Sequence, residues 1–145
     1  MLVAQNSLGS VCPVPLTVRG KGEDDLQTIM MANNYACSLK ELARLEEARA
    51  LYRKWMLVSQ RVLGDCDHCT LTFKKRFAQT LYEDERATLG DLREAVKTLV
   101  ETARIARRVL GGAHPDVVGI EGSLRNARTV LRAREDGKQV RFVKH

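Results

Sequence analysis

The densest group of potentially reactive side chains is the tetrad Cys66-Asp67-His68-Cys69. A Cys-x-x-Cys pair can ligate zinc or cycle between dithiol and disulfide. A structural zinc site needs four ligands, however, and the remaining candidates form no second pair at ligand spacing: Cys12, Cys37, His114 and His145. No His follows Cys69, which excludes haem attachment. We interpret the tetrad as a turn between two helices, with a metal site and a redox site as the alternatives.

Other patterns that support catalysis are missing from the sequence. It contains no phosphate-binding Gly-x-x-x-x-Gly-Lys, no Gly-x-Ser-x-Gly elbow and no His-Glu-x-x-His. Glu83, Asp84 and Glu85 are consecutive, and we expect a solvated acidic cluster there rather than a carboxylate pair for acid/base chemistry. We therefore predict that the protein is not an enzyme and that it uses no metal and no cofactor.

The amino-acid composition predicts the type of secondary structure that carries these residues. Among the 145 residues, aromatics make up only 5% and Pro only 3 residues, while Leu, Ala, Arg and Glu are abundant. Such a composition favours helices packed through small side chains and predicts an all-α fold. No run approaches the roughly 20 apolar residues of a membrane span. The four unevenly spaced Cys are typical of reduced thiols, so we expect a cytoplasmic protein.

The net charge of +6 is concentrated near the C-terminus. Residues 1–96 are balanced, with 13 basic and 13 acidic side chains, whereas residues 97–145 carry 11 basic and 5 acidic ones. The basic residues are Lys97, Arg104, Arg107, Arg108, Arg125, Arg128, Arg132, Arg134, Lys138, Arg141 and Lys144. Two interpretations remain open, a solvated helix surface with a basic tail and a surface for an acidic partner.

The sequence repeats itself. Residues 45–64 align with residues 92–111 at an offset of 47 without a gap. The identical pairs are Leu45/Leu92, Glu47/Glu94, Ala48/Ala95, Arg61/Arg108, Val62/Val109, Leu63/Leu110 and Gly64/Gly111. Seven identities in twenty positions exceed what helical composition alone gives. We conclude that the chain contains an internal repeat.

A preceding helix belongs to each copy. Residues 25–43 and 69–87 match at an offset of 42 through Thr28/Thr70, Ala36/Ala78, Leu39/Leu81 and the aromatic pair Tyr35/Phe77. The larger offset of the second helices implies a five-residue insertion in the turn of the second copy, and loops tolerate such insertions well. A third first-helix fits after Gly111, with Pro115 at its first position.

The expected architecture is two antiparallel helix hairpins and one half, stacked because a lone hairpin cannot bury its apolar stripe. The hairpins span 25–64 and 69–111 and the half repeat spans 115–135, which makes one domain over residues 25–135. An irregular segment, 1–24, precedes it and a basic tail, 136–145, follows it. Gly64 and Gly111 are expected to end the second helices, and Asp24 or Asp25, and Asp91, to serve as N-caps.

The residues Thr28, Asn34-Tyr35-Ala36, Leu39, Glu47-Ala48 and Arg61-Val62-Leu63-Gly64 resemble the long tetratricopeptide repeat of kinesin light chains, which has a period near 42. Leu110-Gly111-Gly112-Ala113-His114-Pro115-Asp116 is similar to the Leu-Gly-x-x-His-Pro-Asp signature of that family. Departures occur at Asp67-His68, where the signature has His-Pro, at Arg76 in place of Asn and at Val117 in place of Thr. They indicate a truncated or degenerate array, and Leu8 to Pro13 resembles the worn hinge of a preceding repeat.

The resemblance implies an α-solenoid of about two and a half repeats whose first helices form a concave groove for a protein or peptide partner. The groove positions of that family fall on Met30, Asn33, Asn34, Cys37, Lys40, Thr72, Lys75, Arg76, Gln79, Glu83 and Asn126. Of these, Asn33, Asn34, Lys40, Lys75, Arg76, Gln79 and Asn126 are the predicted peptide-binding residues, because amides pair with a peptide backbone and cations attract carboxylates. We expect Lys75 and Arg76 to be exposed.

A scaffold that holds an extended or acidic segment of another protein is therefore the predicted function. The alternative is binding of nucleic acid or another acidic surface through the arginine-rich C-terminal third. Few aromatic side chains accompany Arg125, Arg128 and Arg132, so stacking on bases would be weak, and nucleic acid is the less favoured partner.

Overall fold

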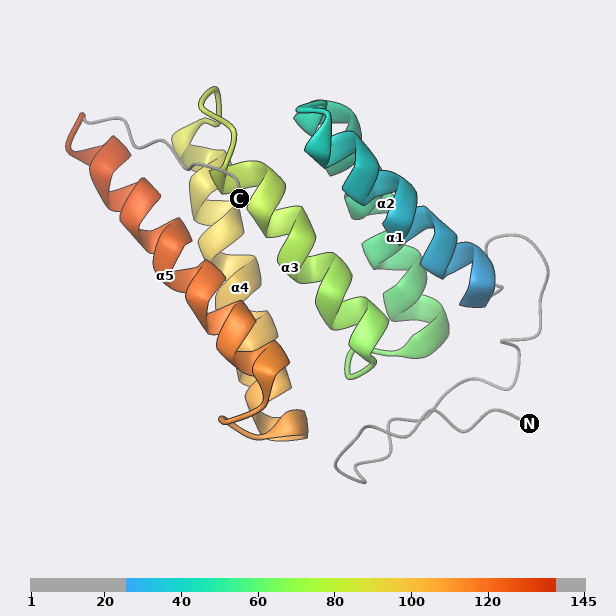
Figure 1. The fold of residues 1–145 in the computed structure, drawn as a ribbon. Helices are drawn as coiled ribbons and strands as arrows, with labels where there is room; N and C mark the ends of the chain where they lie inside the picture. The colour runs from blue at the N-terminus through green and yellow to red at the C-terminus, as the bar shows by residue number, and fades with distance from the viewer. Residues whose placement is uncertain (1–25, 138–145) are drawn as a thin grey trace.

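Five helices make up residues 26–137, the part of the chain that the computed structural model describes (Figure 1). They are α1 (Leu26–Glu41), α2 (Leu45–Leu63), α3 (His68–Tyr82), α4 (Leu89–Leu110) and α5 (Pro115–Glu135). No strand occurs within residues 26–137, and the all-α prediction is confirmed. The expected segment 1–24 with its worn hinge, the caps Asp24 and Asp25, and the tail beyond Gly137 lie outside the described residues. None of these five helices is long and apolar enough to cross a bilayer.

The helices stack in chain order as antiparallel neighbours in two layers, one of α1, α3 and α5 and one of α2 and α4 (Figure 1). Each helix packs against the next, and α3 also approaches both α1 and α5. No comparable approach joins α2 to α4 within the described helices. The layer of first helices is thus the tighter one, and its surface forms the concave side of the stack.

Both hinges between repeats begin with a glycine in the left-handed region. Gly64 ends α2 with φ 90° and Gly111 ends α4 with φ 87°, so the two expected terminators are confirmed. After each hinge a side chain caps the next helix. Asp67 Oδ1 accepts a hydrogen bond from Cys69 N over 2.9 Å, and His114 Nδ1 accepts one from Asp116 N over 3.0 Å. Two different residues thus fill the same N-cap position.

The turn between α3 and α4 differs from the expected one. Asp91 was expected to be the N-cap of α4. Thr88 is the N-cap instead, and Asp91 is the third residue of the helix. Thr88 Oγ1 accepts from Asp91 N and Asp91 Oδ2 accepts from Thr88 N, both over 3.1 Å. This capping box satisfies two backbone donors at once, which explains why α4 begins at Leu89, before the repeat-equivalent Leu92.

The core follows one stripe of residues three and four apart on each second helix, although Leu51 of α2, expected in the same stripe, is only half-buried. Ala48, Tyr52, Trp55, Ser59 and Val62 of α2 are buried, as are Ala95, Leu99, Thr102, Ala106 and Val109 of α4. Polar atoms inside the core are paired, since Ser59 and Thr70 share a hydrogen bond of 2.8 Å between α2 and α3. This packing fixes the relative positions of the first helices, whose other faces line the concave side.

Candidate functional site

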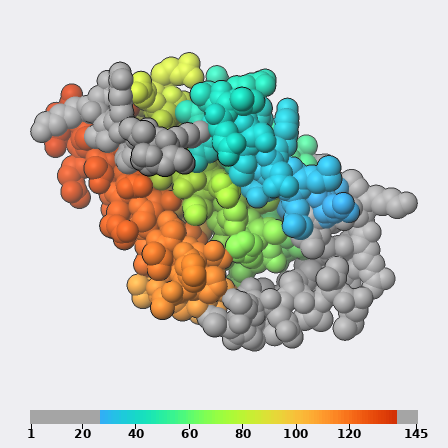
Figure 2. Space-filling view, in the orientation of Figure 1, coloured from blue at the N-terminus to red at the C-terminus, as the bar shows by residue number. Residues whose placement is uncertain are grey.

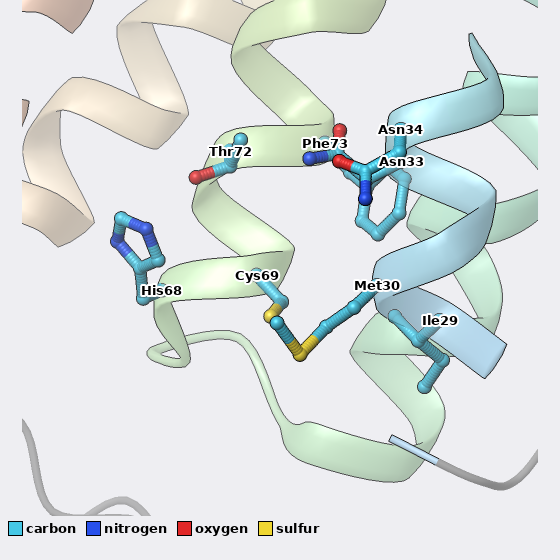
Figure 3. A pocket seen from close by; sticks show the side chains of 8 residues that line it. All are labelled: Ile29, Met30, Asn33, Asn34, His68, Cys69, Thr72 and Phe73. Carbon is cyan, nitrogen blue, oxygen red and sulfur yellow. The ribbon is translucent and has the colours of Figure 1, made fainter. Parts of the chain in front are cut away.

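A cavity of about 150 Å³ opens between α1 and α3 on the concave side (Figure 3). Its lining combines apolar and polar side chains: Ile29, Met30, Asn33, Asn34, His68, Cys69, Thr72 and Phe73. Ile29 and Phe73 are buried, and the Met30 side chain extends from α1 toward Cys69 of α3. The predicted groove positions Met30, Asn33, Asn34 and Thr72 thus meet in one place.

The sequence prediction missed four members of this lining. Ile29 and Phe73 were not singled out in the sequence, and His68 and Cys69 were attributed to the hinge, so their cavity-facing side was not anticipated. The signal available was the helical register, because Cys69, Thr72 and Phe73 are three and four residues apart on α3 and therefore share a face. An apolar base with amide and hydroxyl groups around it suits an apolar side chain and its attached backbone.

The second part of the concave side is a series of side-chain hydrogen bonds that joins α1, α3 and α5. Lys40 Nζ on α1 donates to Gln79 Oε1 on α3 over 3.2 Å, and Gln79 Nε2 donates to Ser123 Oγ on α5 over 3.2 Å. Lys40 Nζ also lies 3.3 Å from Glu83 Oε1. Ser123 was not predicted as a site residue. The remaining predicted residue of α5, Asn126, is exposed and interacts with the Tyr82 hydroxyl, which also interacts with Ser123.

The cations between these two parts are less accessible than expected. Lys75 and Arg76 were predicted to be exposed, but both are half-buried. For Lys75 the reason is the close approach of α5, where a Cβ at Gly119 would lie only 3.3 Å from Lys75 Nζ, whereas Arg76 interacts with Tyr52 of α2. Burial, with the neighbouring charges of Arg76 and Lys40, lowers the pKa of Lys75, while Asp116 acts in the opposite direction.

Two buried polar atoms at the predicted site residues have no hydrogen-bond partner among the described residues, Asn33 Oδ1 and Arg76 Nε. An unpaired buried polar atom costs about 1–3 kcal/mol, and most such atoms in native proteins are paired. One is an acceptor beside the cavity and the other is a donor beside Lys75.

The cysteine tetrad forms the start of α3. Asp67 is its N-cap, and His68, at the place of Pro115 in the next hinge, brings Nδ1 to 3.0 Å from Asp116 Oδ2. Burial, and secondarily Asp67, raises the pKa of Cys69 to about 11, which keeps the thiol protonated and poorly nucleophilic at neutral pH. Within residues 26–137 no three His, Cys, Asp or Glu residues are arranged to hold a metal ion.

The acidic cluster after α3 corrects one expectation. Asp84 was expected to be solvated, but its side chain is buried, and its Oδ1 accepts a hydrogen bond from Arg86 N over 2.9 Å. A carboxylate that accepts from the backbone two residues later forms a tight turn, which orders the inserted loop. Glu83 is paired with Lys40. Asp84 and Glu83 therefore both have structural partners, and they do not form a carboxylate pair that is open to a substrate.

Several of the C-terminal basic residues also have partners. Arg104 pairs with Glu101 at 2.8 Å, Arg107 pairs with Glu121 at 3.1 Å, and Arg134 donates to the carbonyl oxygens of Ala87 and Glu85. The arginine-rich surface thus presents fewer available cations than its sequence indicates. Exposed positions on α5 include Arg125, Arg128 and Arg132.

Comparison with known proteins gives one family. A model of the tetratricopeptide repeat matches residues 28–68, which span α1, α2 and the first hinge, and residues 87–116, which span α4 and the second hinge. The two segments bracket α3, and the match supports a tetratricopeptide repeat protein. No curated protein sequence matches the chain.

Proposed function

We propose that this tetratricopeptide repeat protein binds an extended, acidic segment of a partner protein in the concave groove formed by α1, α3 and α5. Tetratricopeptide repeats generally mediate protein–protein interactions. The proposal adds the chemistry of the ligand and the residues that hold it: Asn33, Asn34, Lys40, Lys75, Arg76, Gln79 and Asn126. We further propose a non-enzymatic scaffold of the kinesin light chain-like type that acts in the cytoplasm.

The observation that carries the proposal is the cavity between α1 and α3. Its volume of about 150 Å³ is below the roughly 300–1,000 Å³ of small-molecule sites. It therefore suits one apolar side chain of a longer ligand, with Ile29 and Phe73 providing the apolar contact. The Asn34 amide beside it carries a donor and an acceptor, the pair needed to hold one peptide unit of the same ligand.

The charge of the ligand follows from the neighbouring cations. Lys75, Arg76 and Lys40 are close enough to one another to affect the pKa of Lys75. A carboxylate placed beside them relieves this repulsion, and half-burial strengthens the attraction because water screens it less. An acidic residue next to the inserted apolar side chain therefore improves binding. The unpaired Arg76 Nε supplies a further donor.

A selection from random displayed peptides tests this function, because the ligand is then chosen by the groove itself. The peptides are selected on the wild-type protein, and we expect enrichment of sequences with a large apolar residue next to Asp or Glu. For a selected peptide, Lys75→Glu with Arg76→Glu should weaken binding at least tenfold, because charge-assisted contacts contribute roughly 1.5–3 kcal/mol each and about 1.4 kcal/mol is one decade.

The control variant carries the same change of charge outside the proposed groove, Arg125→Glu with Arg128→Glu on the exposed side of α5. It should bind the selected peptide like wild type, and circular dichroism should show both variants folded. Weaker binding by the α5 variant alone would move the site to the arginine-rich surface. Random duplex DNA in an electrophoretic shift assay should give no salt-sensitive complex.

A further inference from the structure

The outer face of α1 exposes large apolar side chains in a line. Met31 is 63% exposed, Tyr35 59% and Leu42 67%. Together with Ser38 they are spaced by four, three and four residues, so they continue one side of α1, with Leu42 in the turn directly after its last residue, Glu41. We call these four residues the α1 outer stripe. It contains no charged residue, whereas the solvent-facing side of a helix is ordinarily charged or polar.

The internal repeat shows what covers this face elsewhere in the same chain. At the offset of 42, Met31 corresponds to Phe73 and Tyr35 to Phe77, which are only 1% and 0% exposed on α3. The preceding second helix α2 covers both, since Tyr52 meets the Phe73 ring edge to face at 6.1 Å between centroids and Arg53 lies 4.6 Å above Phe77. The α1 outer stripe is thus a surface of the type that takes an antiparallel helix.

The opposite end of the stack is finished differently. Relative to α3 at the offset of 47, Arg125 replaces Ala78 and Arg128 replaces Leu81. Both counterparts on α3 are fully buried, whereas the two arginines are exposed. A polar outer face is what ends a repeat stack in water. The helix α5 therefore closes its end of the stack, whereas no other described helix covers the outer face of α1 at the opposite end. Figure 2 shows α1 and α5 at opposite ends of the molecule.

A second copy of the chain offers one suitable cover for the open end. In the folded copy, α3 already covers α2 and α5 already covers α4, so neither second helix is free to stack on α1. A head-to-tail stack would place the arginines of α5 against the stripe, and a guanidinium that faces aliphatic side chains loses its hydration without gaining the ring contact that Arg53 makes with Phe77. Outside α1, the exposed large apolar side chains of the described residues are single ones on α2, α4 and α5, namely Leu57, Val100 and Val118. The surface of matching character is therefore the α1 outer stripe itself.

The stripe is complementary to its own two-fold copy. An antiparallel pairing centred between Ala36 and Cys37 places Met31 opposite Leu42 of the other copy, and Tyr35 opposite Ser38. Each large ring then meets a small side chain, which lets the two helices approach closely. We propose that the α1 outer stripes of two copies pair in this antiparallel register and join the protein into a dimer, which leaves the cavity-lining Met30 on a different side of α1.

The dimer is expected to be weak. A pair of 16-residue helices provides an interface below the roughly 1,200 Å² of stable complexes. We expect a dissociation constant of roughly 1–100 µM. Sedimentation equilibrium of the full chain over that range should show a monomer and dimer, and Tyr35→Glu should raise the dissociation constant at least tenfold. Leu57→Glu, a matched change at an exposed apolar residue of α2 outside the stripe, should leave it unchanged.

Register is tested by cross-linking, with Met31→Cys and Leu42→Cys proteins prepared separately and then mixed. A disulfide-linked peptide pair joining positions 31 and 42 of different copies, identified by mass spectrometry, supports the antiparallel register. Predominant links between two copies of position 31 would overturn it. A monomer at every concentration would overturn the proposal. Protection of Met31 and Tyr35 from hydroxyl radicals in such a monomer would assign the cover to another part of the same chain.

Discussion

Gln79 of α3 donates a hydrogen bond from Nε2 to Ser123 Oγ of α5 over 3.2 Å, while its Oε1 accepts one from Lys40 of α1. One amide therefore spans the concave side of the stack. Because an amide has both a donor and an acceptor, it can link a cation on one neighbour to a hydroxyl on the other. A carboxylate at this position would accept from both neighbours, and an apolar residue would contact neither by a hydrogen bond.

The first prediction concerns this link. Gln79→Ala removes both hydrogen bonds, and we expect the free energy of unfolding to fall by about 1–2 kcal/mol, since each such bond contributes about 1 kcal/mol. Ser123→Ala removes the bond from Gln79 and the interaction with the Tyr82 hydroxyl but leaves the bond from Lys40, so we expect a loss of similar size. Urea denaturation followed by circular dichroism measures both. A Gln79→Ala protein as stable as wild type would show that the chain of contacts does not stabilise the fold.

The second prediction concerns Arg134, whose guanidinium donates to the carbonyl oxygens of Ala87 and Glu85 in the turn between α3 and α4. Arg134→Ala leaves these acceptors unpaired, and we expect a loss of about 1–2 kcal/mol. Arg132→Ala removes a cation from the same last turn of α5 without these contacts, so its effect should stay within about 0.5 kcal/mol. Equal losses in the two variants would attribute the effect to the helix dipole instead.

The third prediction is a pH dependence at Lys75. Its folded-state pKa lies below the ordinary 10.5, so the folded protein binds this proton less well than the unfolded chain. The resulting destabilisation is fully present below the folded pKa and disappears as the pH rises toward 10.5. Lys75→Met should therefore be more stable than wild type at pH 7, and the difference should shrink in alkaline buffer. A difference that grows with pH would reverse the assigned sign.

The fourth prediction concerns Cys69, whose pKa is raised to about 11 from 9.0, mainly by burial. At pH 8 its thiolate fraction is about 100-fold below that of an ordinary cysteine, because two pKa units are two decades. Peptide-resolved alkylation with iodoacetamide should find Cys69 modified far more slowly than a cysteine in the unfolded chain. Rapid alkylation in the native protein would indicate an activated thiol and revive the redox interpretation.

The same pKa shift predicts a loss of stability in base. The folded pKa of Cys69 lies above the unfolded one, so the stabilisation is complete below pH 9 and is lost as the pH rises through 11. A Cys69→Ala protein lacks this dependence. The difference in unfolding free energy between wild type and variant should therefore decrease between pH 9 and 11, as measured by denaturant titration at each pH. A constant difference would exclude the shift.

Local sequence determined the helices and their hinges. Gly64 and Gly111 end helices because a glycine takes positive φ without steric penalty, and Pro115 suits a first helical position because it has no N–H to leave unpaired. These are properties of a residue and its immediate neighbours, so spacing alone located them. The buried stripes of α2 and α4 could also be predicted from the sequence, because both copies of the repeat have the same helical periodicity.

Accessibility was decided only by tertiary structure. Lys75 is half-buried because α5 approaches at Gly119, and Asp84 is buried in a turn whose carbonyls are held by Arg134 from the other end of the chain. Tyr35 and Phe77 are equivalent in the repeat, yet α2 covers Phe77 and none of the described helices covers Tyr35. Burial depends on which helix lies alongside, and that neighbour is distant in sequence, so residue type and period cannot specify it.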